Sequence, residues 1–158
     1  AFMQERGAAE QAGLLYGAMG VGSAALAIAV AWFPPRFALR WRWIAFAAVL
    51  SAGAALVLTA TDVSGMLLSL TLMGFGIGPL LVTLYGFGAT RTPPGRSATV
   101  MTLLGSAVIV GQSIAAAVTG VVAQQAGAHA ALALPLGAAL LALAWGGANL
   151  AVTPRRLR

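Results

Sequence analysis

The sequence predicts an all-α integral membrane protein with five transmembrane helices. The 158 residues are 60% hydrophobic and only 8% charged, whereas roughly a quarter of the residues in a soluble domain are charged. The apolar residues form long runs, and a run of ~20 apolar residues is long enough to cross a bilayer as a helix. The runs lack the alternation of a barrel strand, and a helix pairs every backbone group inside lipid.

The first two predicted helices flank a basic loop. The first helix covers residues 12–33 and ends in Trp32 and Phe33 before two prolines, because aromatic side chains favour the membrane interface and proline does not readily continue a helix. The second helix covers about residues 43–60. An arginine at the bilayer centre costs ~2.5–3.5 kcal/mol, so the loop at residues 34–42 must lie outside the hydrocarbon. Its arginines are Arg36, Arg40 and Arg42.

The third predicted helix follows a short turn and leads to a second basic loop. This loop contains Arg91 and Arg96 together with Pro93-Pro94-Gly95, a sequence that breaks a helix. Two further helices follow, joined by a short link at residues 124–129. The predicted ranges are 65–88 for the third helix, 89–97 for the loop, 98–123 and 130–152 for the last two helices, and 153–158 for a basic tail.

The arginines predict the orientation of the chain. Eight of the nine basic residues follow the first, third or fifth helix, so they fall on one side of the membrane. Under the positive-inside rule this side is cytoplasmic. We therefore expect a multi-pass protein of the cytoplasmic membrane with its N-terminus outside and its C-terminus in the cytoplasm. The three acidic residues all fall on the outer side.

The third helix contains the sequence GFGIGP at residues 74–79. Gly74 and Gly78 have the spacing of small residues that allow close helix packing, and Gly76 lies between them. Pro79 deprives a carbonyl of its usual donor, which predicts a kink or pivot. Interrupted helices at membrane depth are typical of transporter sites. The alternative is tight packing without motion.

The fourth helix has a small, polar face and a bulky face. Ser106, Gln112 and Ser113 lie on or beside the first, which also includes Gly120, and large aliphatic residues occupy the other. One interpretation is a packing seam against another helix. The other is a substrate cavity, since a glutamine at membrane depth needs a partner or water. Tyr16 is either a packed residue or a residue at the outer mouth of that cavity.

Composition and motifs argue against several other functions. The net charge of +6 comes from arginines in short loops, which fits membrane orientation better than nucleic-acid binding. The chain has no cysteine and one histidine, His129, without an acidic neighbour, so we expect no metal site. No cofactor motif or catalytic pair occurs, and a membrane enzyme would have only Gln112, Ser113 and hydroxyl groups to use. We therefore expect no enzyme and no cofactor.

The order of these features resembles the C-terminal half of a major facilitator superfamily (MFS) transporter, from its eighth to its twelfth helix. The stretch PRFALRWR resembles the basic loop of that family, although the acid and glycine of the family motif are missing. GFGIGP resembles the glycine-rich tenth helix, and TPPGRSATV its exit into the eleventh. The run from Gly111 to Gly120 resembles the small-residue pattern of the eleventh helix.

The resemblance implies part of a secondary active transporter that moves a small solute by alternating access, with efflux favoured over uptake. The chain would then be a fragment, and its partners would be the solute, the lipid bilayer and the missing N-terminal helices of the same transporter. A different class stays open. The same helices could form a non-transporting membrane scaffold or an assembly subunit.

Overall fold

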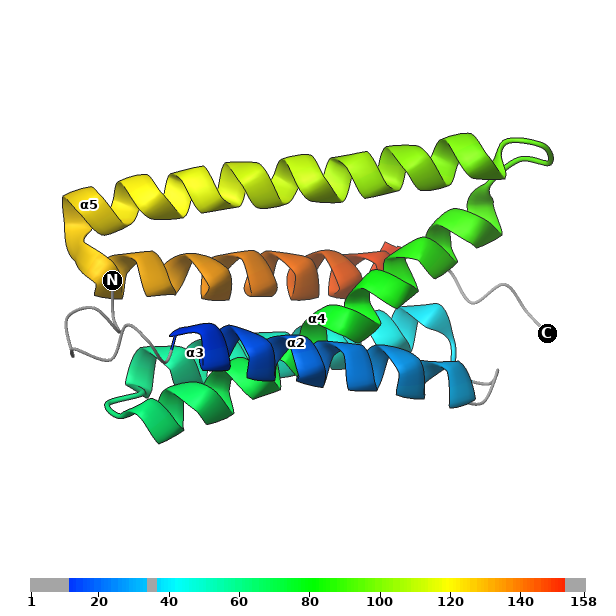
Figure 1. Ribbon diagram of the computed structural model, residues 1–158. Coiled ribbons are helices and arrows are strands. Elements are labelled where there is room, and N and C mark those ends of the chain that lie inside the picture. Colours follow the sequence, from blue (N-terminus) through cyan, green and yellow to red (C-terminus); the bar gives the residue numbers. More distant parts are fainter. Residues whose placement is uncertain (1–11, 34–36, 153–158) are drawn as a thin grey trace.

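The computed structural model describes residues 12–33 and 37–152, and almost all of them are helical (Figure 1). The predicted tail at residues 153–158, the first eleven residues and Arg36 lie outside the described residues. The elements are α2 (Ala12–Ala29), the short 3₁₀ helix η2 (Val30–Trp32), α3 (Leu39–Thr59), α4 (Val63–Arg91) and α5 (Ser97–Val152).

Three of the four α-helices are long and apolar enough to cross a membrane. These are α3, α4 and the part of α5 from Ser97 to Asn149. The apolar part of α2, Gly13–Ala29, is shorter. The described residues therefore have the character of a multi-pass helical membrane protein, but the predicted count of five separate helices differs from the four observed.

The difference in count arises at Gly127. The predicted link at residues 124–129 is absent as a loop, because the residues on both sides of Gly127 are helical. Gly127 alone has non-helical angles, with φ 86° and ψ 167°, a backbone conformation that glycine adopts without steric cost. Since α5 has 56 residues, it would extend about 84 Å if straight. The bend instead places a first leg (residues 97–126) beside a second leg (residues 128–152) (Figure 1).

The basic loops are shorter than predicted. Helix α3 begins at Leu39 and α4 ends at Arg91, so Arg40, Arg42 and Arg91 lie in terminal helical turns. The backbone N–H of Arg42 donates to the carbonyl of Ala38 at 3.1 Å. Arginine is a good helix former, and its long side chain carries the charge away from the apolar surface. These residues therefore extend the helices and do not interrupt them.

Helix α4 lies between α2 and α3 and contacts both through its glycines. Residues 74 and 78 share one face of a helix, whereas residue 76 is about 200° away from residue 74. A Cβ atom on Gly74 would lie 2.2 Å from the carbonyl oxygen of Met19 in α2, and one on Gly78 would lie 2.0 Å from that of Ser23. On the opposite face, a Cβ atom on Gly76 would lie 2.7 Å from Cβ of Leu50 in α3.

Glycine therefore lets two neighbouring backbones approach α4 from opposite sides. The fit is reciprocal on the α3 side, because a Cβ atom on Gly53 of α3 would lie 2.7 Å from the backbone nitrogen of Met73. In lipid, such close approach is a main source of helix association, since apolar side chains gain little by leaving a hydrocarbon solvent.

Pro79 is fully buried, and α4 continues through it from Val63 to Arg91. The hydroxyl of Thr83, which is 1% exposed, donates to the Pro79 carbonyl at 2.7 Å. This bond satisfies a buried polar group without a partner from another helix.

The apolar core forms two clusters, one toward each end of the bundle. One includes Leu15, Val57 and Met66, and the other includes Val30 and Phe46. The second leg of α5 packs against both clusters through Leu132, Leu136 and Leu143. Among the described residues, the first leg contributes nothing to either cluster. Helices α2, α3, α4 and the second leg of α5 are therefore the packed part of the molecule.

The glycine contacts predict different effects for two otherwise similar substitutions. Gly78→Ala adds a methyl group where the Ser23 carbonyl already lies, and we expect a destabilisation of roughly 1–3 kcal/mol from overpacking. Gly120→Ala adds the same group where no atom lies within 4 Å, so the gain in helix propensity, up to ~1 kcal/mol, should dominate. Thermal unfolding of both variants in one detergent measures the difference. Equal or higher stability of Gly78→Ala would contradict the close contact.

Candidate functional site

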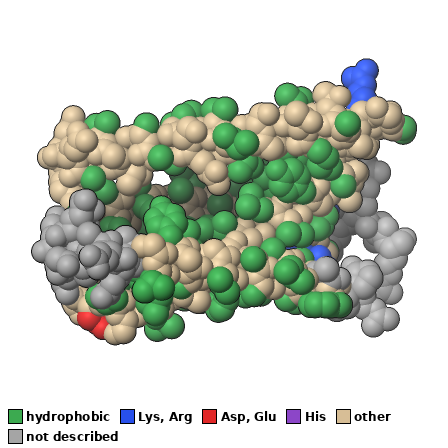
Figure 2. All heavy atoms as spheres, viewed as in Figure 1, with side chains coloured by type: hydrophobic (Ala, Val, Ile, Leu, Met, Phe, Trp, Pro, Cys, Tyr) green, Lys and Arg blue, Asp and Glu red, His purple; other side chains and the backbone are tan. Residues whose placement is uncertain are grey.

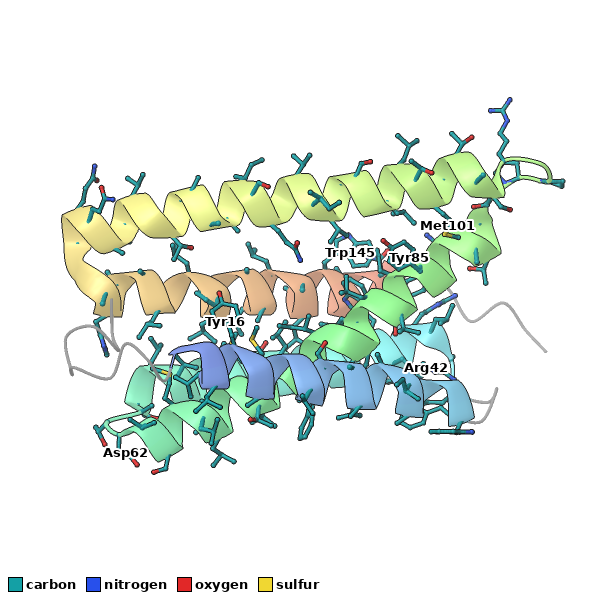
Figure 3. The ribbon with its side chains drawn as sticks, viewed as in Figure 1. Tyr16, Arg42, Asp62, Tyr85, Met101 and Trp145 are labelled. Atoms are coloured by element: carbon teal, nitrogen blue, oxygen red, sulfur yellow. The ribbon has the colours of Figure 1, made fainter. Side chains whose placement is uncertain are left out.

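The predicted cavity residues lie on two elements. Ser106, Gln112 and Ser113 lie on the first leg of α5, and all three are exposed. Tyr16 lies on α2 and is 75% exposed (Figure 3). No contact joins Tyr16 to the three residues of α5 among the described hydrogen bonds and ring contacts. The structure thus presents these residues on its surface and does not gather them around one enclosed space.

A groove runs between the two legs of α5, and its lining is apolar. Its volume is about 440 Å³, and Figure 2 shows the hollow between the first leg and the rest of the molecule. From the first leg, Gly111, Ile114 and Val118 line it, and from the second leg Leu134 and Pro135. The bulky face of the predicted fourth helix therefore includes two residues, Ile114 and Val118, that line this groove.

Ser106 and Ser113 lie on the opposite side of the first leg, whereas Thr119 lines the groove. Ser113 is two residues beyond Gly111, which corresponds to a rotation of about 200°, and Ser106 is seven residues from Ser113 and so shares its face. The Ser113 hydroxyl donates to the Ile109 carbonyl at 3.0 Å. We call this surface the polar stripe and define it by its exposed members, Thr99, Thr102, Ser106, Ser113, Ala116 and Gly120.

Gln112 lies between the groove and the polar stripe. It is midway along the first leg, equally distant in sequence from Ser97 and from the bend at Gly127. No described residue hydrogen-bonds to its side-chain amide. The leg around it is apolar, and none of its most hydrophobic stretch is buried in the protein. An amide in the middle of a membrane-spanning helix needs water or another polypeptide as its partner.

The predicted packing glycines fall into two groups. Gly74, Gly76 and Gly78 lie in the close contacts of α4, whereas a Cβ atom on Gly111 or Gly120 would meet no atom within 4 Å. The first leg approaches α4 only near its beginning, where a Cβ atom on Gly88 would lie 2.5 Å from the side chain of Leu104. Gly111 and Gly120 are thus open positions in the structure.

The described charges separate along the bundle axis. Arg42 and Asp62 lie at opposite ends of the molecule (Figure 3), and the other described arginines, Arg40, Arg91 and Arg96, lie at the Arg42 end by their positions at helix termini. The Ser64 hydroxyl donates to the Asp62 carboxylate and, with smaller backbone contributions, holds the pKa of this exposed group below its usual value. Among the described residues, no three His, Asp or Glu side chains come together as metal ligands.

The side chain of Arg42 stabilises the described ends of the connection between α2 and α3. Its Nε donates to the carbonyl of Phe37 at 2.8 Å, and its guanidinium lies 5.8 Å from the ring centres of both Phe33 and Phe37. Phe33 in turn stacks on Phe46 of the core at 6.2 Å. The role of this arginine is therefore structural as well as electrostatic.

No known protein family, characterised protein or solved structure matches the chain.

An aromatic cluster at the basic end was not predicted from the sequence. Trp43 of α3 lies 5.5 Å from Trp145 of α5 and 6.2 Å from Phe87 of α4, measured between ring centres. Its indole N–H donates to the Ala142 carbonyl at 2.9 Å. The sequence shows one such aromatic residue near the basic end of each of three helices. Only the packing of the helices shows that the ring of Trp43 contacts the other two.

Two tryptophans of α3 give a test of this cluster. Trp43→Phe removes the indole donor and leaves the Ala142 carbonyl without this partner, so we expect a loss of about 1 kcal/mol in stability. Trp41→Phe is the matched control, because Trp41 is 57% exposed and its change should stay within ~0.5 kcal/mol. Thermal unfolding in detergent measures both. Equal effects would show that the cluster does not hold α3 to α5.

Proposed function

We propose that the chain is part of a secondary active transporter of the MFS type, which moves a small solute across the cytoplasmic membrane by alternating access, with efflux favoured over uptake. The observation that carries the proposal is the exposed side chain of Gln112, midway along an apolar helical leg and without a described hydrogen-bond partner. A polar group at this depth is typical of a surface that meets a solute pathway.

The distribution of packing supports this proposal. Alternating access requires a bundle that moves as a unit and a surface that faces its counterpart. The glycine contacts of α4 provide the bundle that moves as a unit, because they let the backbones of α2 and α3 pack directly against α4. The first leg of α5 provides the surface that faces its counterpart, because its polar stripe is exposed. In this proposal the missing N-terminal helices of the same transporter face that stripe across the pathway.

The charge separation supports an orientation. All described arginines lie at one end of the bundle, and the only described acid, Asp62, lies at the other. Under the positive-inside rule, the arginine end is cytoplasmic. The described spans contain no carboxylate for coupling to a proton or ion, so in this proposal such a group belongs to another part of the transporter.

The alternative is a membrane scaffold or assembly subunit. The exposed first leg also favours this function, because an apolar helix with a small-residue stripe is a good contact surface for another membrane protein. The two functions differ in whether water reaches the stripe.

Access of water to the first leg distinguishes the two functions. The 158 residues contain no cysteine, so Gln112→Cys and Ser113→Cys each add one thiol to this part of the protein, and any cysteine elsewhere in the gene product is first replaced by serine. For a transporter, both thiols should react with a membrane-impermeant reagent from either side, in right-side-out and in inside-out vesicles. Thr83→Cys is the buried control, since Thr83 is 1% exposed. Failure of both first-leg thiols to react from either side would contradict transport and support a scaffold.

A further inference from the structure

A small pocket opens at the basic end of the bundle, where three helices terminate. Arg40 from the first turn of α3, Arg91 from the last turn of α4, and Trp145 and Asn149 from the second leg of α5 line it, with Trp43 and Phe87 of the aromatic cluster between them. Its volume is about 80 Å³. Sites that enclose a drug-sized ligand are about 300–1,000 Å³, so this pocket suits a group of only a few atoms.

Positive charge is concentrated at this pocket. Arg40 and Arg91 both line it, and among the described residues neither guanidinium hydrogen-bonds to another residue. The only described acid, Asp62, lies at the opposite end of α3 and α4. Two like charges that face one pocket repel each other. An anion bound between them replaces this repulsion with two attractive interactions. Arginine is suited to that role because its planar donors match the oxygens of a phosphate or carboxylate.

The arginines differ in how they are held. The Arg91 guanidinium lies 5.7 Å from the ring centre of Phe87, a contact that positions the charge without using a hydrogen bond to oxygen. Arg42, by contrast, donates to the Phe37 carbonyl, lies beside the rings of Phe33 and Phe37, and does not line the pocket. Arg96 is exposed in the turn between α4 and α5 and does not line the pocket.

The aromatic residues favour a position of the pocket at the depth of lipid headgroups. Trp32, Trp41, Trp43 and Trp145 all lie toward the basic end of the bundle, and the first, second and fourth are more than half exposed. Tryptophan is enriched where the hydrocarbon meets the headgroups. Basic pockets between membrane helices at the cytoplasmic surface are a known setting for anionic headgroups.

We propose that this pocket binds a phosphate group, either that of an anionic phospholipid or a free phosphate, between Arg40 and Arg91. The rings of Trp43 and Phe87 form its apolar wall. The site is independent of the proposed transport function, because it requires only that the basic end lies at a membrane surface.

The test compares single arginine variants of the full chain in neutral detergent. Native mass spectrometry measures binding of phosphatidylglycerol, with phosphatidylcholine as the uncharged reference. Arg40→Gln and Arg91→Gln should each lower the affinity for phosphatidylglycerol roughly fivefold, and the double variant roughly 30-fold, the loss expected for two arginine contacts to an anionic lipid. Arg96→Gln is the matched control, because it removes the same charge at the same end of the bundle without touching the pocket. We expect it to change the affinity by less than about twofold.

A second arm identifies the source of the phosphate. Inorganic phosphate is titrated into the chain in phosphatidylcholine nanodiscs, and tryptophan fluorescence reports on the indoles of the pocket. A saturable response that the double variant lacks indicates a site for free phosphate, whereas discrimination in the lipid arm alone indicates a headgroup site. Circular dichroism checks that the double variant keeps its helical content. Equal behaviour of the double variant and Arg96→Gln in both arms would overturn the proposal.

Discussion

The contact of α4 with the backbones of α2 and α3 is the constraint on which the rest of the structure depends. Three glycines in a six-residue stretch present bare backbone in two opposite directions, so α4 is held between two helices without a bulky side chain on either contact. Within a bilayer this matters more than apolar burial, because lipid solvates leucine as well as a protein interior does. The two apolar clusters and the aromatic cluster then form around helices whose spacing is already set.

The same constraint leaves the first leg of α5 outside the packed part. The second leg packs against α3, and the bend at Gly127 returns the chain so that the first leg lies beside it across an apolar groove. The exposed polar stripe and the amide of Gln112, which has no partner among the described residues, are consequences of this position. A transporter would use such a surface for a solute pathway, and a scaffold would use it for a partner. The two proposed functions differ in one respect: water reaches Gln112 in a transporter, and a partner protein covers it in a scaffold.

The sequence was informative where local rules decide the structure. The spacing of Gly74 and Gly78 predicted close packing on one face of α4, and the apolar runs predicted helices, although the structure has four α-helices and not five. Helix ends were less predictable, because a terminal arginine such as Arg40 or Arg91 can extend a helix while its charge reaches water. The sequence predicted a six-residue link at residues 124–129. In the structure only Gly127 leaves the helical conformation, so the chain turns at a bend within α5.

Contacts between distant residues could not be predicted. The direction of the second leg decides which residues of the first leg face the groove, namely Gly111, Ile114 and Val118. Hydrophobicity and residue size do not reveal that direction. The direction of the second leg also brings the Ala142 carbonyl to the indole N–H of Trp43. It likewise completes the pocket that Arg40 and Arg91 line. In each case the residue type was visible in the sequence, but its partner was not.

In the proposed function, α3, α4 and α5 cross the membrane with the arginine and tryptophan end at the cytoplasmic surface. Labelling of single cysteines in intact cells tests this claim most directly. Gln125→Cys lies near the bend of α5, and Ala98→Cys lies at the beginning of α5 near the arginines; both positions are exposed. An impermeant thiol reagent should modify Gln125→Cys in intact cells and Ala98→Cys only after permeabilisation. Modification of both thiols in intact cells, or the reverse order, would contradict the claim.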